Sequence, residues 1–237
     1  MMVRGSQQML GKKAAIVLVL GVMGMLIFSV FWQGSTAVVS PLGKDFVVIL
    51  DPGHGGYDPG AISSKGVYEK AINLQVANMV KEMIRPSGVK VFLTREEDMD
   101  FVPDGVKGKT TKKQIDLNYR IDMASKEKAD IFVSLHVNAT TAGRNSGAET
   151  FYHYKSESGK RLAELIQQEL IKISGMNRRI AKPGDFYVIK NTSMPAVIVE
   201  VGYLSSVKEQ KKLQQTWYQE QLARAISKGI ANYFELP

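Results

Sequence analysis

Residues 46–56 read Phe-Val-Val-Ile-Leu-Asp-Pro-Gly-His-Gly-Gly, an apolar run that ends in a turn. A short apolar run bounded by turn-forming residues is typical of a strand buried in a sheet. The glycines on both sides of His54 allow the chain to bend sharply and leave the imidazole projecting. A single histidine in a glycine-rich turn lies more often on the surface than in a site, so other segments must decide its role.

Further apolar runs alternate with helical patterns along the rest of the chain. The first helix is predicted at residues 68–84, where apolar side chains recur at helical spacing before a Pro-Ser-Gly stop. Strands are expected at 46–50, 89–94, 131–136, 149–154, 186–189 and 196–201, and further helices at 114–126, 158–174 and 207–234, the last in one or two pieces. Such alternation predicts an α/β fold, a single domain with a mostly parallel sheet flanked by helices.

The composition limits the kinds of site that this sequence can build. Its 237 residues suit one domain with a short appendage. There are no cysteines, so any metal site must use carboxylates and the three histidines, His54, His136 and His153. The formal net charge of +8 favours anionic partners, but none of the common nucleic-acid-binding motifs is present, so no nucleic acid is expected as a partner.

The N-terminus carries the features of a targeting segment. Arg4, Lys12 and Lys13 precede an uncharged apolar run over residues 14–32. A run of about 19 residues is long for the apolar part of a signal peptide and nearly enough to span a bilayer. The protein is expected to be exported, with either a signal peptide or a membrane anchor at residues 1–37, a linker at 38–45 and a catalytic domain at 46–237.

Three predicted strands carry side chains suited to chemistry at or near their carboxyl ends. His54 follows the first strand, His136 ends the third, and Glu200 lies within the last apolar run. Because the carboxyl ends of parallel strands meet at one edge of a sheet, these side chains are expected to converge there. Two of only three histidines at such positions indicate a metal site more strongly than either histidine alone.

Two glutamates are candidates to complete the site, and each has an alternative interpretation. A catalytic zinc site needs about three protein ligands and an open position, and Glu69 is placed to join the two histidines. Equally, Glu69 is an acid in the first turn of a helix, where it complements the helix dipole. Glu200 is either a general base beside the metal or an edge-strand residue that faces solvent.

As a set, these segments resemble the zinc-dependent N-acetylmuramoyl-L-alanine amidases of the amidase-3 family, through the motifs at residues 48–56, 68–70, 94–95, 134–139 and 199–204. The resemblance implies a twisted six-stranded sheet like that of zinc exopeptidases, Zn2+ bound by His54, Glu69 and His136, and Glu200 as the catalytic acid and base. The bond cut would be the amide between the lactyl group of N-acetylmuramic acid and L-alanine in peptidoglycan. Arg95 and Asn138 would orient substrate or strand ends, whereas His153 matches no ligand position.

Within the family, the polar excursion at residues 98–113 is longer than in minimal members, and the layout is similar to that of the sporulation amidases of the spore cortex. That resemblance implies a role in forming muramic-δ-lactam, with a muramic acid deacetylase as functional partner. The enzyme would act in the cell wall or the intermembrane space of the forespore. Two alternatives stay open: a zinc peptidase that cuts within the stem peptides, and a non-catalytic, membrane-anchored wall-binding protein.

Overall fold

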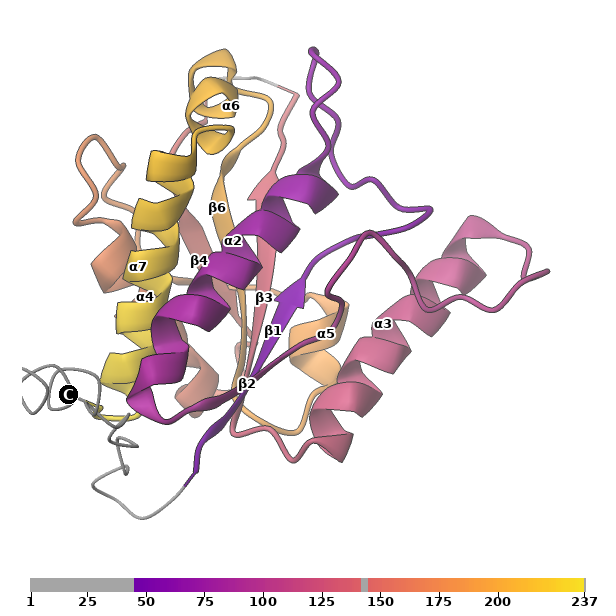
Figure 1. Ribbon diagram of the computed structural model, residues 1–237, viewed down its shortest axis with the longest axis horizontal. Helices are drawn as coiled ribbons and strands as arrows, with labels where there is room; N and C mark the ends of the chain where they lie inside the picture. Colours follow the sequence, from indigo (N-terminus) through magenta and orange to yellow (C-terminus); the bar gives the residue numbers. More distant parts are fainter. Residues whose placement is uncertain (1–44, 142–144, 237) are drawn as a thin grey trace, which may run out of the picture. The chain divides into compact units, whose positions relative to one another are not determined.

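The computed structural model describes residues 45–141 and 145–236, which contain a six-stranded sheet (Figure 1). In the sheet order β2-β1-β3-β6-β4-β5, the strands are Lys90–Leu93, Val47–Pro52, Ile131–Asn138, Ala196–Tyr203, Glu149–Tyr152 and Lys182–Pro183. The first four run parallel to one another, β4 is antiparallel to β6, and β5 is parallel to β4. The predicted α/β fold with a mostly parallel sheet is therefore confirmed.

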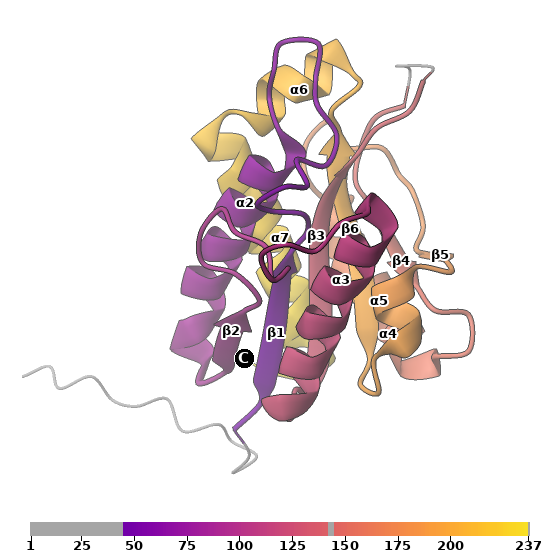
Figure 2. The same cartoon turned by 90° about the vertical axis from the view of Figure 1, so that its right-hand side faces the viewer.

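Helices cover both faces of the sheet, as Figures 1 and 2 show. Each face of the sheet packs against its own hydrophobic core. Successive side chains of a strand point to opposite faces, so Val48 and Leu50 of β1 belong to one core and Ile49 to the other. The first face carries α2 (Glu69–Ile84), α4 (Glu157–Leu170) and α7 (Thr216–Tyr233), and the second carries α3 (Lys109–Lys126) and α5 (Tyr187–Asn191). The short helices α6 (Val207–Leu213) and η1 (Arg85–Ser87) follow β6 and α2 along the chain.

The local sequence accounts for these elements. The parallel strands β1, β3 and β6 are apolar on both faces because helices cover both, and Val133 and Val199 have no exposed surface. In contrast, α4 is amphipathic, and it begins where the Ser156 hydroxyl accepts a hydrogen bond of 3.0 Å from the backbone N–H of Gly159. The three parallel strands end at one edge of the sheet, and the polar residues at their ends lie there together.

Two predictions of secondary structure were wrong. Residues 186–189 are not a strand: Val188 and Ile189 belong to helix α5, where they are buried in the same core as the apolar side of α3. A short apolar run fits either structure, and only tertiary packing decides between them. The sixth strand is instead β5, whose two residues are too few to leave a pattern. The helix expected from residue 114 begins at Lys109, so the end of the polar excursion is helical.

The predicted targeting segment at residues 1–37 and all but the last residue of the predicted linker at 38–45 lie outside the described residues. Among the helices of the described part, none combines the length and apolar character needed to cross a bilayer. The choice between a signal peptide and an anchor therefore stays a prediction.

Candidate metal centre

Three side chains from separate elements meet at the carboxyl edge of the sheet. His54 lies in the loop after β1, Glu69 is the first residue of α2, and His136 lies near the end of β3. One ligand atom from each lies within 4.8 Å of the others. The shortest separations join Glu69 Oε1 to His136 Nδ1, at 2.9 Å, and to His54 Nε2, at 3.2 Å. The structure thus brings the three sequence-predicted ligands together in an arrangement that could hold a divalent cation.

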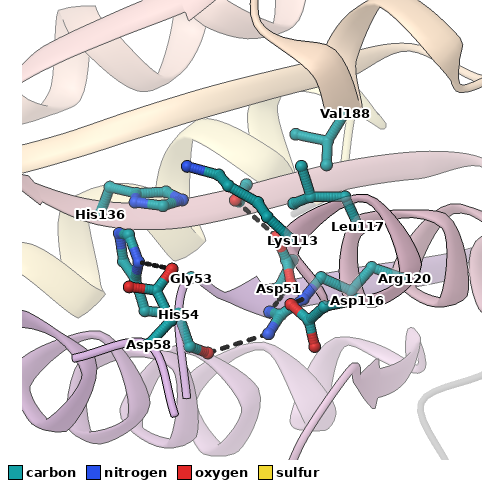
Figure 3. Close-up of a pocket in the computed structure, with 11 residues that line it drawn as sticks. Asp51, Gly53, His54, Asp58, Lys113, Asp116, Leu117, Arg120, His136 and Val188 are labelled. Atoms are coloured by element: carbon teal, nitrogen blue, oxygen red, sulfur yellow. Dashed lines mark hydrogen bonds and ion pairs between the residues drawn. The ribbon is translucent and has the colours of Figure 1, made fainter. Parts of the chain in front are cut away.

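The backbone around His54 adopts a conformation that few residues tolerate. Its φ of 63° lies in the left-handed region, where histidine is more common than most non-glycine residues. The preceding residue must be small, since a Cβ atom at Gly53 would lie 2.2 Å from the His136 ring. The turn therefore lets the two imidazoles approach each other, with ring centroids 4.9 Å apart (Figure 3).

Asp58 orients the His54 ring. Its Oδ2 atom lies 2.8 Å from His54 Nδ1, and its Oδ1 atom accepts the backbone N–H of Gly60 at 3.1 Å. In neutral His54, a proton on Nδ1 directed at Asp58 would leave the Nε2 lone pair free for a metal ion, as metal-bound histidines commonly do. Burial alone would lower the pKa of His54, but hydrogen bonds and charges from Asp58 and Glu69 raise it to about 9. The surroundings therefore favour a positive charge here.

Glu69 is held through both of its carboxylate oxygens. Oε2 accepts the backbone N–H of Ala61 at 2.8 Å, and Oε1 accepts that of Val137 at 3.0 Å. Burial opposes its ionisation, but hydrogen bonds with His136 and His54 hold the pKa of Glu69 well below its ordinary value. The residue does open a helix, as predicted, but its carboxylate is turned into the cluster, so the helix dipole alone does not explain it.

A buried polar network lies beneath the His54 turn and is centred on Asp51, which is 1 % exposed. Its Oδ1 atom accepts hydrogen bonds of 2.7 Å from Thr94 Oγ1 and from Arg120 Nη1, and Oδ2 accepts one of 2.6 Å from Ser134 Oγ. Burial alone would raise the pKa of Asp51, but the Arg120 charge and these bonds lower it. Asp51 is therefore a fully partnered anion.

Two buried arginines fix the carbonyl groups of the same turn. Arg95 Nε donates to the carbonyls of Pro52 at 2.9 Å and His54 at 2.7 Å, and its Nη2 donates to that of Gly53 at 3.1 Å. Arg120 also donates to the Pro52 and His54 carbonyls, at 3.0 and 2.9 Å. Of the two roles predicted for Arg95, these contacts favour orienting the strand end over binding substrate. Sequence reasoning missed Arg120 and Asp58, although the latter follows His54 by four residues within one loop.

Glu200 lies directly across from His136 in the neighbouring strands β6 and β3. Its Oε2 atom is buried and has no hydrogen-bond partner among the described residues. Burial, more than any other effect, raises the pKa of Glu200 to about 7. The edge-strand alternative is wrong, because β6 lies between β3 and β4. A carboxyl group that titrates near neutrality beside the cluster suits acid–base chemistry.

The remaining sequence candidates lie apart from the cluster or support it. Asn138 ends β3, and its backbone carbonyl accepts the N–H of Leu204 at 2.8 Å, so this contact joins two strand ends. His153 follows β4, which runs antiparallel to β6 and therefore ends at the opposite edge of the sheet. The reading of His153 as a residue outside the site agrees with that position.

The excursion is anchored to the loop that carries His54. Asp98 accepts the backbone N–H of Gly56 at 2.9 Å, and Asp100 accepts that of Tyr57 at 3.0 Å. Lys70 of α2 adds an ion pair of 2.7 Å to Asp98. These contacts fix the first part of the excursion against the loop that carries His54.

A pocket of about 60 Å³ opens beside the cluster. Figure 3 shows residues from β1, β3, α3 and α5 around it. The lining residues are Asp51, Gly53, His54, Asp58, Lys113, Asp116, Leu117, Arg120, Ser134, His136 and Val188.

Comparison with known proteins places this geometry in context. The sequence model of a family described as N-acetylmuramoyl-L-alanine amidase matches residues 48–232. The germination-specific N-acetylmuramoyl-L-alanine amidase of Bacillus subtilis is 36% identical over 189 residues, which are 79% of each chain. The solved structure of the CwlD amidase from Clostridioides difficile, in complex with the GerS lipoprotein, has a TM-score of 0.78 and 38% identity, covering 81% of this chain and 99% of that one. The catalytic domain of the amidase CwlV from Bacillus (Paenibacillus) polymyxa has a TM-score of 0.71 and 34% identity, covering 81% of this chain and 99% of that one.

Proposed function

The chain belongs to the N-acetylmuramoyl-L-alanine amidase family, and from that premise we propose that it is a zinc hydrolase of spore-cortex peptidoglycan. Family membership makes it a peptidoglycan amidase, and its substrate lies outside the cytoplasm. The observation that carries the zinc assignment is the convergence of two imidazole nitrogens and one carboxylate oxygen, with the unpartnered Oε2 atom of Glu200 on the adjacent strand.

The donor set at the site fits zinc. In a tetrahedral site with bonds of about 2.0 Å, neighbouring ligand atoms lie about 3.3 Å apart. Glu69 Oε1 lies 2.9 and 3.2 Å from the two histidine nitrogens, close to that spacing. Two histidines and one carboxylate also leave a coordination position open, as in catalytic zinc sites. When bound, zinc supplies a Lewis acid that polarises the amide carbonyl and makes water acidic enough to react near neutral pH.

Glu200 acts as the general base and then the general acid. It takes a proton from the attacking water and delivers it to the nitrogen of the leaving L-alanine. The peptide departs as an amine, and the lactyl group is left as a carboxylic acid. Burial raises the pKa of Glu200 to about 7 without the metal, and a bound cation nearby would lower it, so the group would be ionised and able to accept the proton near neutral pH.

The other residues keep the ligands in place. Asp58 fixes the ring orientation of His54, while Arg95 and Arg120 hold the carbonyls of the turn that carries it. Such supporting contacts to metal ligands are expected to raise metal affinity by orienting the donor atoms in advance.

The spore-cortex role rests on the likeness to the germination-specific amidase of Bacillus subtilis. In that role the enzyme removes stem peptides so that muramic-δ-lactam can form, and a muramic acid deacetylase would act on its product. The solved relative from Clostridioides difficile is a complex with a lipoprotein. That complex supports a lipoprotein partner for this chain, in addition to the deacetylase inferred from the sequence resemblance.

Digestion of purified cortex peptidoglycan by the zinc-loaded enzyme tests the reaction. We expect mass spectrometry to find intact stem peptides with a free L-alanine amine, and glycan with a free lactyl carboxyl group. Fragments cut between amino acids would identify the peptidase alternative. Retention on the wall without any cleavage would identify the wall-binding alternative.

Muropeptide analysis of spores that lack the protein tests the cortex role separately. The proposal predicts that muramic-δ-lactam is lost from these spores. A normal muramic-δ-lactam content would remove the spore role and leave the amidase chemistry intact.

A further inference from the structure

The first turns of α3 carry a cluster of lysines. Lys109, Lys112 and Lys113 lie in these turns, and Lys107 precedes them. No acidic residue occupies the first turn, and within the described part of the chain these lysines form no ion pair. Positive charge at the amino end of a helix opposes the helix dipole and does not stabilise α3. The stability of α3 therefore does not explain why these lysines are there.

Lys113 reaches the metal centre. It lines the same pocket as His54 and His136, and Figure 3 shows its side chain extending along that pocket toward His136. Three carboxylates line this pocket, and each already has partners: Asp58 has His54 Nδ1 and the Gly60 N–H, while Asp51 and Asp116 pair with Arg120. The ammonium group of Lys113 acts on Asp58 only through its charge and forms no ion pair with the described residues, so it can pair with a ligand beside the site where the substrate must bind.

Lys109 and Lys112 line a second and larger pocket of about 480 Å³. Its opposite wall is the loop from Tyr57 to Pro59, and the Lys112 ammonium lies 5.4 Å from the centre of the Tyr57 ring. Asp58 lines both pockets, so the larger one adjoins the metal pocket. The lysines consequently form one wall that leads away from the metal centre.

On the β4 side of the site, two of the described cations are held by an acid. Arg179 and Lys182 both pair with the buried carboxylate of Glu149, which faces Glu200 across the β4–β6 pair. The single carboxylate of Glu149 offsets one of these two positive charges and holds both side chains against the sheet. On the α3 side, by contrast, Lys109, Lys112 and Lys113 line pockets and form no ion pair with the described residues.

We propose that Lys109, Lys112 and Lys113 form a subsite that binds the carboxylates of the acidic stem peptide during cleavage. The proposal rests on the proposed function, because it places the peptide side of the scissile amide along α3. N-acetylated glycan is neutral, whereas stem peptides carry free carboxylates from their glutamate and diamino-acid residues, so the peptide is the anionic part of the substrate. A lysine binds such groups as a point charge and needs no fixed angle.

Binding of the cleavage product isolates this subsite from the chemistry. The probe is the free tripeptide L-alanyl-γ-D-glutamyl-diaminopimelate, compared with the same peptide with all of its carboxylates amidated. By calorimetry on the full-length zinc-loaded protein, we expect the free acid to bind roughly tenfold more tightly than the amide, and the difference to shrink with added salt. The variant Lys112→Met/Lys113→Met should lose this preference, and Lys113→Arg, which keeps the charge, should retain it.

Lys126→Met, at the other end of α3, is the matched control and should bind like the wild type. Melting temperatures of all variants show whether they fold. On a muramoyl tripeptide, the double variant should show a rise in KM of roughly threefold to tenfold with little change in kcat. Equal binding of acid and amide by the wild type, or an unchanged preference in the folded double variant, would overturn the proposal. Lysine-dependent binding without cleavage of the muramoyl amide would instead overturn the proposed function and leave the subsite standing.

Discussion

Asp51 and Glu200 are carboxylates at the same edge of the sheet, and they differ in what surrounds their oxygen atoms. Asp51 accepts hydrogen bonds on both oxygens, from Thr94, Arg120 and Ser134. Glu200 has a buried Oε2 atom with no partner among the described residues. The pKa of Asp51 is lowered by its partners, whereas burial raises that of Glu200 to about 7.

The two carboxylates have different roles in one site: Asp51 holds the structure, and Glu200 reacts. Partners that satisfy Asp51 also remove its capacity to react, so its charge serves to hold the His54 turn through Arg120. A carboxylate without such partners costs folding free energy, and proteins keep this cost where the group has a function. Asp51 should therefore matter for stability, and Glu200 for turnover.

The largest expected effect is the loss of turnover in Glu200→Gln. We expect kcat to fall roughly 10³-fold, because general acid–base catalysis contributes about 10²- to 10⁴-fold. The unfolding free energy should not fall, because the amide replaces a desolvated carboxyl group of the same shape. Cleavage of a muramoyl peptide and thermal melting measure the two quantities, with Glu220→Gln on the exposed side of α7 as the control. If Glu200→Gln lost as much free energy of unfolding as of transition-state stabilisation, Glu200 would be a structural residue like Asp51.

The converse change is Asp51→Asn, which leaves Arg120 beside a neutral group. Removing one partner of a buried ion pair costs about 3 kcal/mol or more, and we expect a loss of this size in the unfolding free energy. Urea denaturation of the zinc-free protein measures it without a contribution from metal binding. If the variant were as stable as the wild type but inactive, Asp51 would belong to the chemistry and the comparison would fail.

A smaller effect is expected for Asp58→Ala, because Asp58 contacts a ligand but does not bind the metal itself. Losing the hydrogen bond that orients a metal-binding histidine lowers metal affinity roughly 10- to 100-fold. Competition with a zinc chelator measures the affinity, and Asp104→Ala in the exposed excursion provides the control. Unchanged affinity would show that the His54 ring is oriented by its backbone alone.

The smallest effect is the pH dependence that Asp51 adds to stability. Its pKa is lower in the folded chain than the ordinary 3.8, so the unfolded chain takes up its proton first as acid is added. The stabilisation is complete above that ordinary value and is lost as the pH falls through the folded pKa. One such proton changes stability by at most about 1.4 kcal/mol per pH unit. The difference in unfolding free energy between wild type and Asp51→Asn should therefore become smaller only below about pH 4. If the difference became larger in acid, the pKa of Asp51 would be raised in the folded chain and not lowered.

The sequence identified the residues of the cluster better than the residues that support it. His54 and His136 could be found because only three histidines exist and two of them stand at strand ends. Family resemblance was needed for Glu69, since its place at the start of a helix has an ordinary explanation. Their roles as ligands stay predictions, although the structure brings all three together.

The supporting network was hidden because its bonds join distant parts of the chain. Arg120 lies 69 residues from Asp51, in the middle of a helix whose pattern shows only which side is apolar. Most partners of Arg95 are backbone carbonyls, which leave no trace in the sequence. The same limit explains α5, where packing against α3 decided that a short apolar run became a helix.

The most direct test of the account is the zinc content of Glu69→Gln and Glu200→Gln, measured side by side by elemental analysis of the folded proteins. If Glu69 is a ligand and Glu200 the acid and base, Glu200→Gln should keep one zinc per chain, like the wild type, and Glu69→Gln should hold far less. Loss of zinc from Glu200→Gln with full retention in Glu69→Gln would contradict this division of roles.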